Sequence, residues 1–204
     1  MRNMIFDIGV LKKMMKTAYE GNGLLVENQD GRIILGGSYW KISVYENLFP
    51  KKAKAALVEL IGTLPLPGDV LRCTHEGNQV EMLDEDLDKI VENMSWKNRY
   101  EKTSLILESK MGQIRPYQME GDKHTVYLNE IFTQLLDGKP EPGEDDYIQG
   151  PCKNNENEKR VFFLTDTCVL EAWEIVPNVE DKTDPTASKL SKAMLQLADM
   201  ELPK

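Results

Sequence analysis

A tight turn between two short apolar segments constrains the fold of this chain most. Leu24–Val26 and Ile33–Leu35 flank the polar stretch Asn28–Gly31, which ends in an Asp-Gly pair. Such a pair readily adopts the positive backbone φ angles that a tight hairpin turn requires. The next segment, Tyr39–Tyr45, alternates apolar and polar residues, as a half-buried strand does. Three adjacent strands are therefore expected early in the chain.

Three other segments carry apolar residues at helical spacing. The first spans 7–19, with Leu11, Met14 and Met15 on one face. The second follows Asn47, which is the expected cap, and closes at Gly62. The third lies near the C-terminus, and its expected cap is Thr186 or Ser188. Its apolar positions are Leu190, Ala193, Met194, Leu197 and Ala198.

The middle of the chain contains an internal similarity. Residues 69–94 and 112–138 both predict strand, turn, strand and helix, and the turns Glu76–Asn78 and Glu120–Asp122 match at an offset of 44. Two such units would pack as a pseudo-symmetric pair. Independent use of a common local motif explains the similarity equally well.

These patterns predict an α+β fold, mostly antiparallel sheet with packed helices, and a C-terminal helix. Two further strands are expected at Val161–Leu164 and Val169–Val176. We expect a single domain over residues 1–176, with a mobile acidic loop at about 138–158 that is rich in proline, asparagine and acids. Residues 177–204 are expected to form a linker and an amphipathic helix.

The composition is that of a chain with a substantial core, because 41% of the 204 residues are hydrophobic and 29% are charged. No apolar run approaches the ~20 residues of a membrane-spanning helix, so no membrane role is expected. Asp7 interrupts the apolar N-terminus before a secretory segment can form. We expect a cytoplasmic protein with Cys73, Cys152 and Cys168 reduced.

The net charge of −9 is unevenly distributed along the chain. Residues 1–62 carry 9 basic and 6 acidic side chains, residues 63–150 carry 9 and 18, and residues 151–204 carry 7 and 10. An acidic field disfavours direct nucleic-acid binding, which depends on Lys and Arg contacts with phosphates. The charge has a second explanation, since it also keeps a protein soluble.

Two acidic runs are the candidate partner-binding residues. Their carboxylates would present a phosphate-like row to a basic groove and steer association electrostatically. Acids in a first helical turn and in a loop also have ordinary structural reasons. The residues are Asp84, Glu85, Asp86 and Asp88 in the first run, and Glu141, Glu144, Asp145 and Asp146 in the second.

Lys51, Lys52 and Lys54 lie in the opening turns of the second helix, where acids are normally preferred. Helix amides and three lysines suit an anion, such as a phosphate or a partner's carboxylate. A solvated lysine face is the alternative interpretation.

The two histidines, His75 and His124, stand beside the turns of the internal similarity. Pseudo-symmetric packing would place them with Glu76 and Asp122 as a metal or acid-base cluster, although nothing in their spacing requires it. Gly36–Ser38 lacks the following helix of a nucleotide-binding loop. The sequence assigns no catalytic residue, metal or cofactor.

We expect a non-enzymatic binding or regulatory module that acts by protein–protein contact with a basic partner. Such a profile suits a phage or mobile-element inhibitor of a host nucleic-acid enzyme, as anti-CRISPR proteins are. The competing hypothesis is an enzyme or anion-binding domain with a site assembled from distant residues. The C-terminal helix is expected to pack on its own domain, and pairing with a second copy is the alternative.

Overall fold

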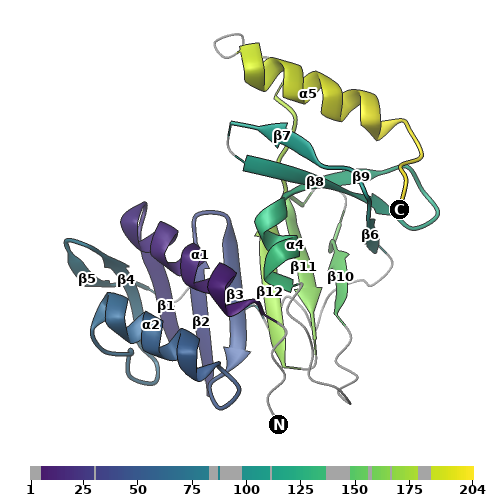
Figure 1. The fold of residues 1–204 in the computed structure, drawn as a ribbon. Coiled ribbons are helices and arrows are strands. Elements are labelled where there is room, and N and C mark those ends of the chain that lie inside the picture. The colour runs from purple at the N-terminus through teal and green to yellow at the C-terminus, as the bar shows by residue number, and fades with distance from the viewer. Residues whose placement is uncertain are drawn as a thin grey trace. The chain divides into compact units, whose positions relative to one another are not determined.

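The computed structural model describes residues 6–29, 31–82, 87, 98–110, 112–136, 148–155, 158–165, 167–178 and 185–204. The described residues form four helices and twelve strands in two sheets, which confirms the predicted α+β class with a C-terminal helix (Figure 1). The chain divides into two compact units. Unit 1 comprises residues 1–93, 134–148 and 164–171, and unit 2 comprises residues 94–133, 149–163 and 172–204.

The units interleave along the sequence. The chain passes between them within α4 (Glu130–Leu136), β11 (Arg160–Leu164) and β12 (Cys168–Trp173). The C-terminal helix belongs to unit 2. No helix among the described residues has the length and apolar character needed to span a membrane.

Unit 1 begins with α1 (Ile8–Glu20), as the apolar spacing predicts. Asp7 caps the helix, because its Oδ1 accepts a hydrogen bond from the backbone N–H of Val10 at 2.9 Å. Leu11, Met14 and Met15 are buried along one face. The helix ends at Gly21, whose N–H donates to carbonyls of the last turn.

Three strands follow α1 and form an antiparallel meander: β1 (Leu24–Gln29), β2 (Arg32–Gly37) and β3 (Trp40–Tyr45). The predicted hairpin turn is confirmed, and Gly31 has the positive φ of 76° that its Asp-Gly sequence supplies. Within unit 1 the strand order is β12-β3-β2-β1-β4-β5, with β4 at Val70–Thr74 and β5 at Gly77–Val80.

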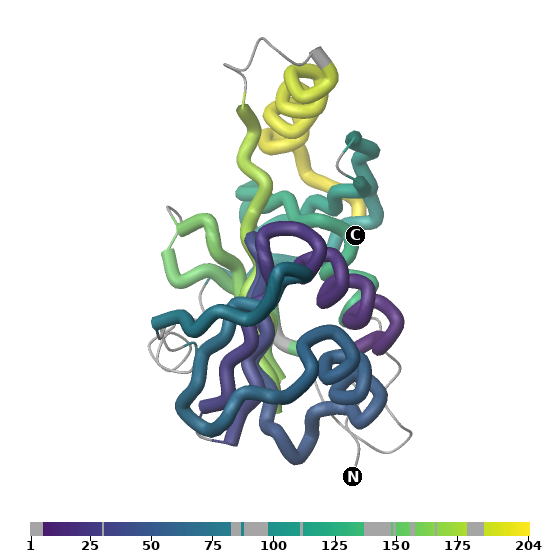
Figure 2. Tube along the Cα trace, turned by 90° about the vertical axis from the view of Figure 1, so that its left-hand side faces the viewer, coloured from purple at the N-terminus to yellow at the C-terminus, as the bar shows by residue number. Residues whose placement is uncertain are grey.

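Register gives the meander two buried faces, one of which is almost entirely apolar. Val26, Leu35 and Ile42 are successive cross-strand partners, and all three are fully buried. Figure 2 shows α1 and α2 (Lys51–Ile61) on one side of these strands, and α1 contacts β1, β2 and α2. These helices contribute four fully buried side chains, Leu11, Met15, Ala53 and Leu57. This helix-covered face is the core of unit 1.

The start of α2 differs from the sequence prediction. Asn47 is not its cap, because residues 45–49 form turns in which Leu48 N donates to Tyr45 O and Phe49 N donates to Glu46 O. The helix begins after Pro50, and no side chain caps it. Proline suits this position, because its fixed φ matches a helix entry and it has no N–H to leave unpaired.

The opposite face of the meander carries a buried ion pair. Lys41 on β3 places its Nζ 3.1 Å from Oε1 of Glu27 on β1. The residues are 7% and 2% exposed. Ser43 on the same face is also buried, and Arg32 donates to its hydroxyl at 3.2 Å. Each buried charge is stabilised mainly by the opposite charge of its partner, because neither group is hydrated by solvent.

Unit 2 is organised around β8 (Gly112–Met119). This strand pairs antiparallel with β6 (Tyr100–Lys102), β7 (Leu107–Ser109) and β9 (Thr125–Asn129). The residues of β8 alternate between two buried faces. Ile114 and Gln118 face the C-terminal segment, whereas Arg115 and Tyr117 face the N-terminal turn of α4.

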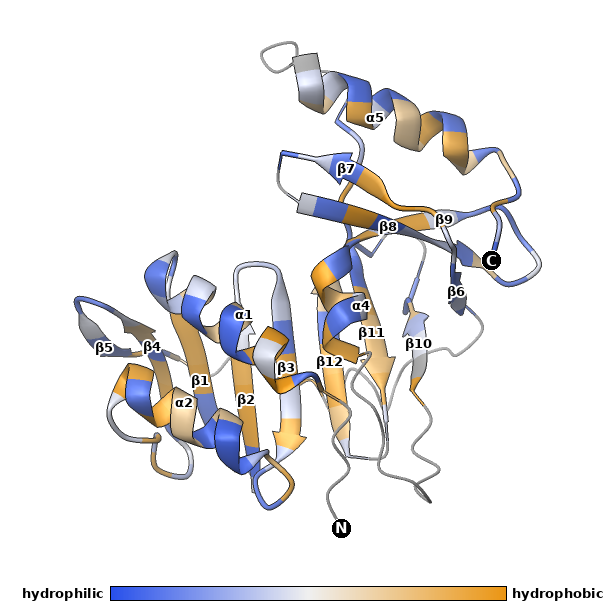
Figure 3. Cartoon of the chain, viewed as in Figure 1, coloured by the Kyte–Doolittle hydropathy of each residue, from blue (hydrophilic) through white to orange (hydrophobic). Residues whose placement is uncertain are grey.

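The C-terminal helix α5 (Pro185–Ala198) packs on this sheet. Met194 joins a core cluster with Ile114 and Tyr127, and the Tyr127 hydroxyl donates to Met194 O at 2.5 Å. Hydrophobic and hydrophilic residues intermingle along α5, as Figure 3 shows. The expected caps Thr186 and Ser188 are wrong, because the helix already begins at Pro185.

The segment after α5 is held by one buried side chain. The amide nitrogen of Gln118 donates to Met200 O at 2.7 Å, and its amide oxygen accepts from Leu202 N at 2.9 Å. Ser104 N donates to Pro203 O, and Lys204 pairs with Glu101. The predicted packing of the helix on its own domain therefore extends to the chain end.

The internal similarity corresponds to two hairpins in different units. β4 and β5 belong to unit 1, whereas β8 and β9 belong to unit 2. The second hairpin leads into α4, as predicted, and the helix expected near 84–94 lies outside the described residues apart from Leu87, which is helical. Each hairpin contributes to its own unit's sheet.

The loop predicted at about 138–158 contains a strand. β10 (Gln149–Cys152) pairs with β11, and Lys153 is 1% exposed with its Nζ 2.7 Å from Glu174 Oε2. The acidic part of this loop lies outside the described residues. The sequence prediction missed β10, whose strand partner β11 is near in sequence but whose other contacts are remote: Arg99 bridges Cys152, and Lys153 N donates to Asn98 O.

Removing one charge of the buried pair in unit 1 should destabilise the protein. Lys41→Met leaves Glu27 buried without its cation, so we expect the free energy of unfolding to fall by about 3–5 kcal/mol. Urea denaturation measures the change. Lys12→Met, at an exposed position on α1, is the matched control and should change stability by less than about 0.5 kcal/mol. Equal effects of the two variants would contradict this account.

Gln118→Leu should loosen the C-terminal segment. The substitution removes both amide bonds to Met200 and Leu202 and leaves the buried Leu202 N–H unpaired, which costs about 1–3 kcal/mol. Hydrogen exchange should show faster exchange of the Leu202 amide. Thermal unfolding should show a lower melting temperature. Gln113→Leu provides the control, because Gln113 bonds only an exposed Glu108 carboxylate among the described contacts. Unchanged exchange at Leu202 would argue against the role assigned to Gln118.

Candidate functional site

The β4–β5 hairpin of unit 1 presents a strand edge and is the candidate interaction surface. β5 is the last strand in the order, and Figure 1 shows it beyond β4. The hairpin turns at His75 and Glu76, slightly earlier than the predicted Glu76–Asn78 turn. Thr74 stabilises this turn, since its hydroxyl accepts from Glu76 N at 3.2 Å and donates to Gly77 O at 3.3 Å.

The hydrogen-bond register shows which backbone groups of β5 face outward. Glu81 N donates to Val70 O at 2.9 Å, and Leu71 is the partner of Val80. In an antiparallel ladder, hydrogen-bonded and non-hydrogen-bonded pairs alternate. Gln79 therefore bonds to β4, whereas Asn78 and Val80 direct their N–H and C=O groups away from it. No described residue hydrogen-bonds to these outward backbone groups.

The side chains of β5 are all exposed. Val80 is 83% exposed, and Met82, just beyond the strand, is 90% exposed. An isolated exposed apolar residue is ordinary, but two beside an unpaired backbone edge resemble the composition of a docking strand. Glu76 adds an exposed carboxylate at the other end of the strand.

Two contacts fix the hairpin on unit 1. The Asn78 amide donates to Ile61 O at 3.0 Å, next to Gly62, whose φ of 85° ends α2. Arg72 on β4 pairs with Glu81 at 2.5 Å. A strand held at both ends offers a preorganised edge, which reduces the entropy lost when a partner binds.

The three lysines of the predicted anion-binding site lie in the opening turns of α2. Lys51 and Lys52 are exposed at its first turn, but Lys54 pairs with Glu46 at 2.8 Å. Backbone N–H groups of Ala53 and Lys54 donate to Pro50 O. Two of the three lysines therefore face solvent at the helix start, and the third is engaged.

The two histidines belong to different units. His75 and Glu76 lie in the exposed turn of unit 1, with 3.9 Å between His75 Nε2 and Glu76 Oε1. In unit 2, His124 Nδ1 lies 2.9 Å from the Tyr100 hydroxyl. Asp122 Oδ1 accepts from the backbone N–H groups of Lys123 and His124. The described residues contain no group of three or more His, Cys, Asp or Glu side chains that suits a metal.

Both predicted acidic runs lie outside the described residues. This applies to Asp84, Glu85, Asp86 and Asp88, and to Glu141, Glu144, Asp145 and Asp146. The first run follows β5 and Met82 in the sequence, so the strand edge and these acids are neighbours along the chain.

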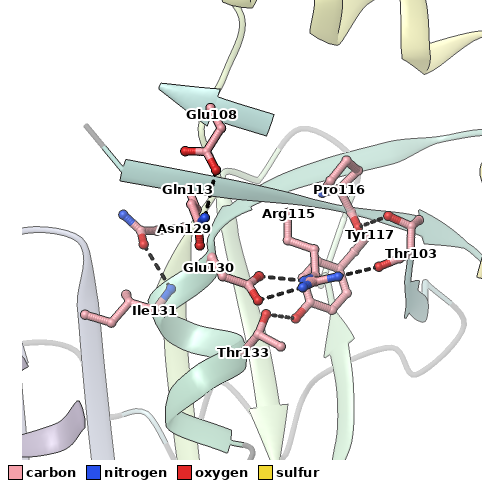
Figure 4. Close-up of polar contacts among 10 residues, drawn as sticks. All are labelled: Thr103, Glu108, Gln113, Arg115, Pro116, Tyr117, Asn129, Glu130, Ile131 and Thr133. Atoms are coloured by element: carbon pink, nitrogen blue, oxygen red, sulfur yellow. Dashed lines mark hydrogen bonds and ion pairs between the residues drawn. The ribbon is translucent and has the colours of Figure 1, made fainter. Parts of the chain in front are cut away.

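A polar cluster between β8 and α4 serves the packing of unit 2 (Figure 4). The Arg115 guanidinium donates two bonds to the Glu130 carboxylate, at 2.5 and 2.6 Å, and a third to Thr103 O at 2.7 Å. Beside it, the Tyr117 and Thr133 hydroxyls are 2.7 Å apart. Such bidentate geometry fixes the orientation of α4 on the sheet.

The cysteines are buried free thiols. Burial raises the pKa of Cys73 to about 11, and it also raises the pKa of Cys152, against which Arg99 acts by favouring the thiolate. A nucleophilic or metal-binding cysteine needs its thiolate, so burial makes these two thiols unreactive near neutral pH.

The sequence prediction found the hairpin but not its position at the edge of the sheet. Apolar Val80 and acidic Glu81 were visible in the sequence, whereas the edge position depends on β4 pairing with β1, which lies about fifty residues earlier. No protein-family model matches the chain, and no curated protein matches it in sequence.

The Cys73 thiol should make stability fall in alkali. Its folded-state pKa is about 11 against an ordinary value of 9.0. The folded state therefore keeps a proton that the unfolded chain releases, so this contribution is complete below pH 9 and is lost as pH rises to 11. The contribution of the Cys73 thiol to the free energy of unfolding amounts to at most about 3 kcal/mol. Urea unfolding of wild type and Cys73→Ala at pH 8 and 10.5 should show a smaller decrease in the variant, and identical decreases would refute it.

Proposed function

We propose that this protein is a binding module that acts by contact with a partner protein whose binding surface is basic. The observation that carries the proposal is the outward edge of β5, with exposed Val80 and Met82, placed in the sequence directly before the Asp84–Asp88 acidic run. A preorganised apolar edge supplies contact area, and a neighbouring acidic field supplies steering and selectivity.

The charge distribution supports a basic partner. Residues 63–150 carry 18 acidic and 9 basic side chains, so the half of the chain that contains the edge strand is the most negative. Such a field accelerates the approach of a cationic surface and repels polyanions. One form of this function is inhibition of a host nucleic-acid enzyme by a phage or mobile-element protein, in which carboxylates occupy a groove that otherwise binds phosphates.

An anion-binding or enzymatic site at the start of α2 is the second candidate. Lys51 and Lys52 favour it, because both are exposed beside helix N–H groups. The ion pair of Lys54 with Glu46 weakens it, because one of the three cations already has a carboxylate. Pairing of two copies through α5 remains a further partner hypothesis, for which Leu195 and Met200 offer exposed apolar side chains.

Neutralising the first acidic run, Asp84–Asp88, should reduce partner capture. The tagged protein is used to recover partners from lysate at low and physiological salt, and bound proteins are identified by mass spectrometry. We expect one basic protein, recovered less well at the higher salt because the Debye length shortens to about 8 Å. A variant with Asp84→Asn, Glu85→Gln, Asp86→Asn and Asp88→Asn should recover at least about tenfold less, which corresponds to roughly 1.4 kcal/mol.

A matched control has the same change in net charge at four exposed acids elsewhere: Glu20→Gln, Glu59→Gln, Asp199→Asn and Glu201→Gln. It should retain most of the capture. Equal loss in both variants would reduce the interaction to overall charge. Recovery of no basic protein would overturn the proposal, and a melting temperature raised by inorganic phosphate would then favour the anion site.

A further inference from the structure

We propose that β5 binds its partner by strand addition, taking an extended, lysine- or arginine-containing segment of that protein as a further antiparallel or parallel strand. This inference rests on the proposed function and specifies its contact. The backbone supplies the first argument. Asn78 and Val80 point their N–H and C=O groups away from β4, and strand addition satisfies such groups with main-chain hydrogen bonds.

Among the described residues, shortness is the one usual device against pairing that this edge shows. Sheets protect their edges with lysine, proline, bulges or a covering element. The four residues of β5 are Gly77, Asn78, Gln79 and Val80, so none is charged and none is proline. The regular register from Thr74–Gly77 to Leu71–Val80 contains no bulge. The strand is short, which restricts the contact to a few residues and favours a reversible interaction.

The side chains around β5 define the chemistry of the occupant. Val80 shares a face with Leu71, its cross-strand partner, and with Asn78, whose amide bonds the end of α2. A partner strand would place alternate side chains on this face, where an apolar residue finds Val80. Glu76 places an exposed carboxylate at one end of the strand, whereas Glu81 at the other end is already paired with Arg72. An extended segment in which apolar and basic residues alternate is complementary to this edge.

A second copy of the chain is a poorer occupant. Two β5 edges would bring like charges together, since each carries its own Glu76 and the acidic residues that follow it in the sequence. Like-charge juxtaposition across an interface costs several kcal/mol in general. The net charge of −9 on each copy adds long-range repulsion at low salt.

Titration with a defined peptide tests strand addition directly. The probe is a peptide of about eight residues in which lysine alternates with valine, added to the full-length ¹⁵N-labelled protein. We expect exchange of the Asn78 and Val80 amide protons to slow at least about tenfold, because a docked strand pairs them. The Gln79 amide already bonds to β4 and should change little, which makes it an internal control. A peptide with glutamate in place of lysine should not protect either amide.

Two single substitutions separate the edge from overall charge. Val80→Lys and Tyr39→Lys each add one positive charge at an exposed position of unit 1. Val80→Lys should weaken peptide binding about tenfold, whereas Tyr39→Lys should leave it within about twofold. Equal weakening, or protection of amides elsewhere than β5, would overturn strand addition. Protection that rises with protein concentration in the absence of peptide would instead identify a second copy as the occupant.

The same variants distinguish this inference from the proposed function. If neutralising the first acidic run abolishes partner capture while Val80→Lys leaves it intact, the edge proposal fails and the binding function stands. If no basic partner is captured at all, the binding function fails, whatever the peptide result. Loss of capture with Val80→Lys but not with Tyr39→Lys, together with protection of the Asn78 and Val80 amides, is the outcome expected for strand addition.

Discussion

The antiparallel pairing of β1 with two partners is the constraint on which unit 1 depends. β1 pairs with β2 through a tight turn of neighbouring residues, and with β4 after a connection that includes α2. The first pairing is local and is encoded by the Asp-Gly turn. The second pairing places β4 and β5 on the side of β1 away from β2 and β3, so β5 becomes the edge strand. The position of the candidate interface is therefore a consequence of where β4 pairs.

Unit 2 depends in a similar way on a strand with two buried faces. On one face of β8, Ile114 and Gln118 receive α5 and the chain end. On the other, Arg115 and Tyr117 hold the start of α4 through charged and hydroxyl contacts. A strand buried on both sides needs polar residues whose hydrogen bonds are fully used, because unpaired groups there are costly. These polar residues read in the sequence as features of an exposed strand.

Local signals explain where the sequence predictions succeeded. The apolar spacing of Leu11, Met14 and Met15 and the Asp-Gly turn each act over a few residues, and both predictions were confirmed. The predictions at Asn47, Thr186 and Ser188 failed because proline displaced the helix start by its own backbone restriction. β10 was missed in a polar segment, where part of its support comes from residues 98–99, about fifty positions earlier in the sequence. The acidic runs stay predictions.

The sequence by itself determined the α+β class, the early meander, the main helices and the excess of acidic residues in the middle of the chain. Periodicity, turn chemistry and charge are local or additive properties, so they can be read from the sequence without knowledge of the folded structure. Only the tertiary structure decided that β5 is an edge, that Lys41 and Glu27 form a buried pair, and that Gln118 holds the chain end. These features join residues that are far apart in sequence. Folding buries the charged and amide groups away from water and leaves the β5 backbone edge exposed, so the energy of each feature depends on the folded structure.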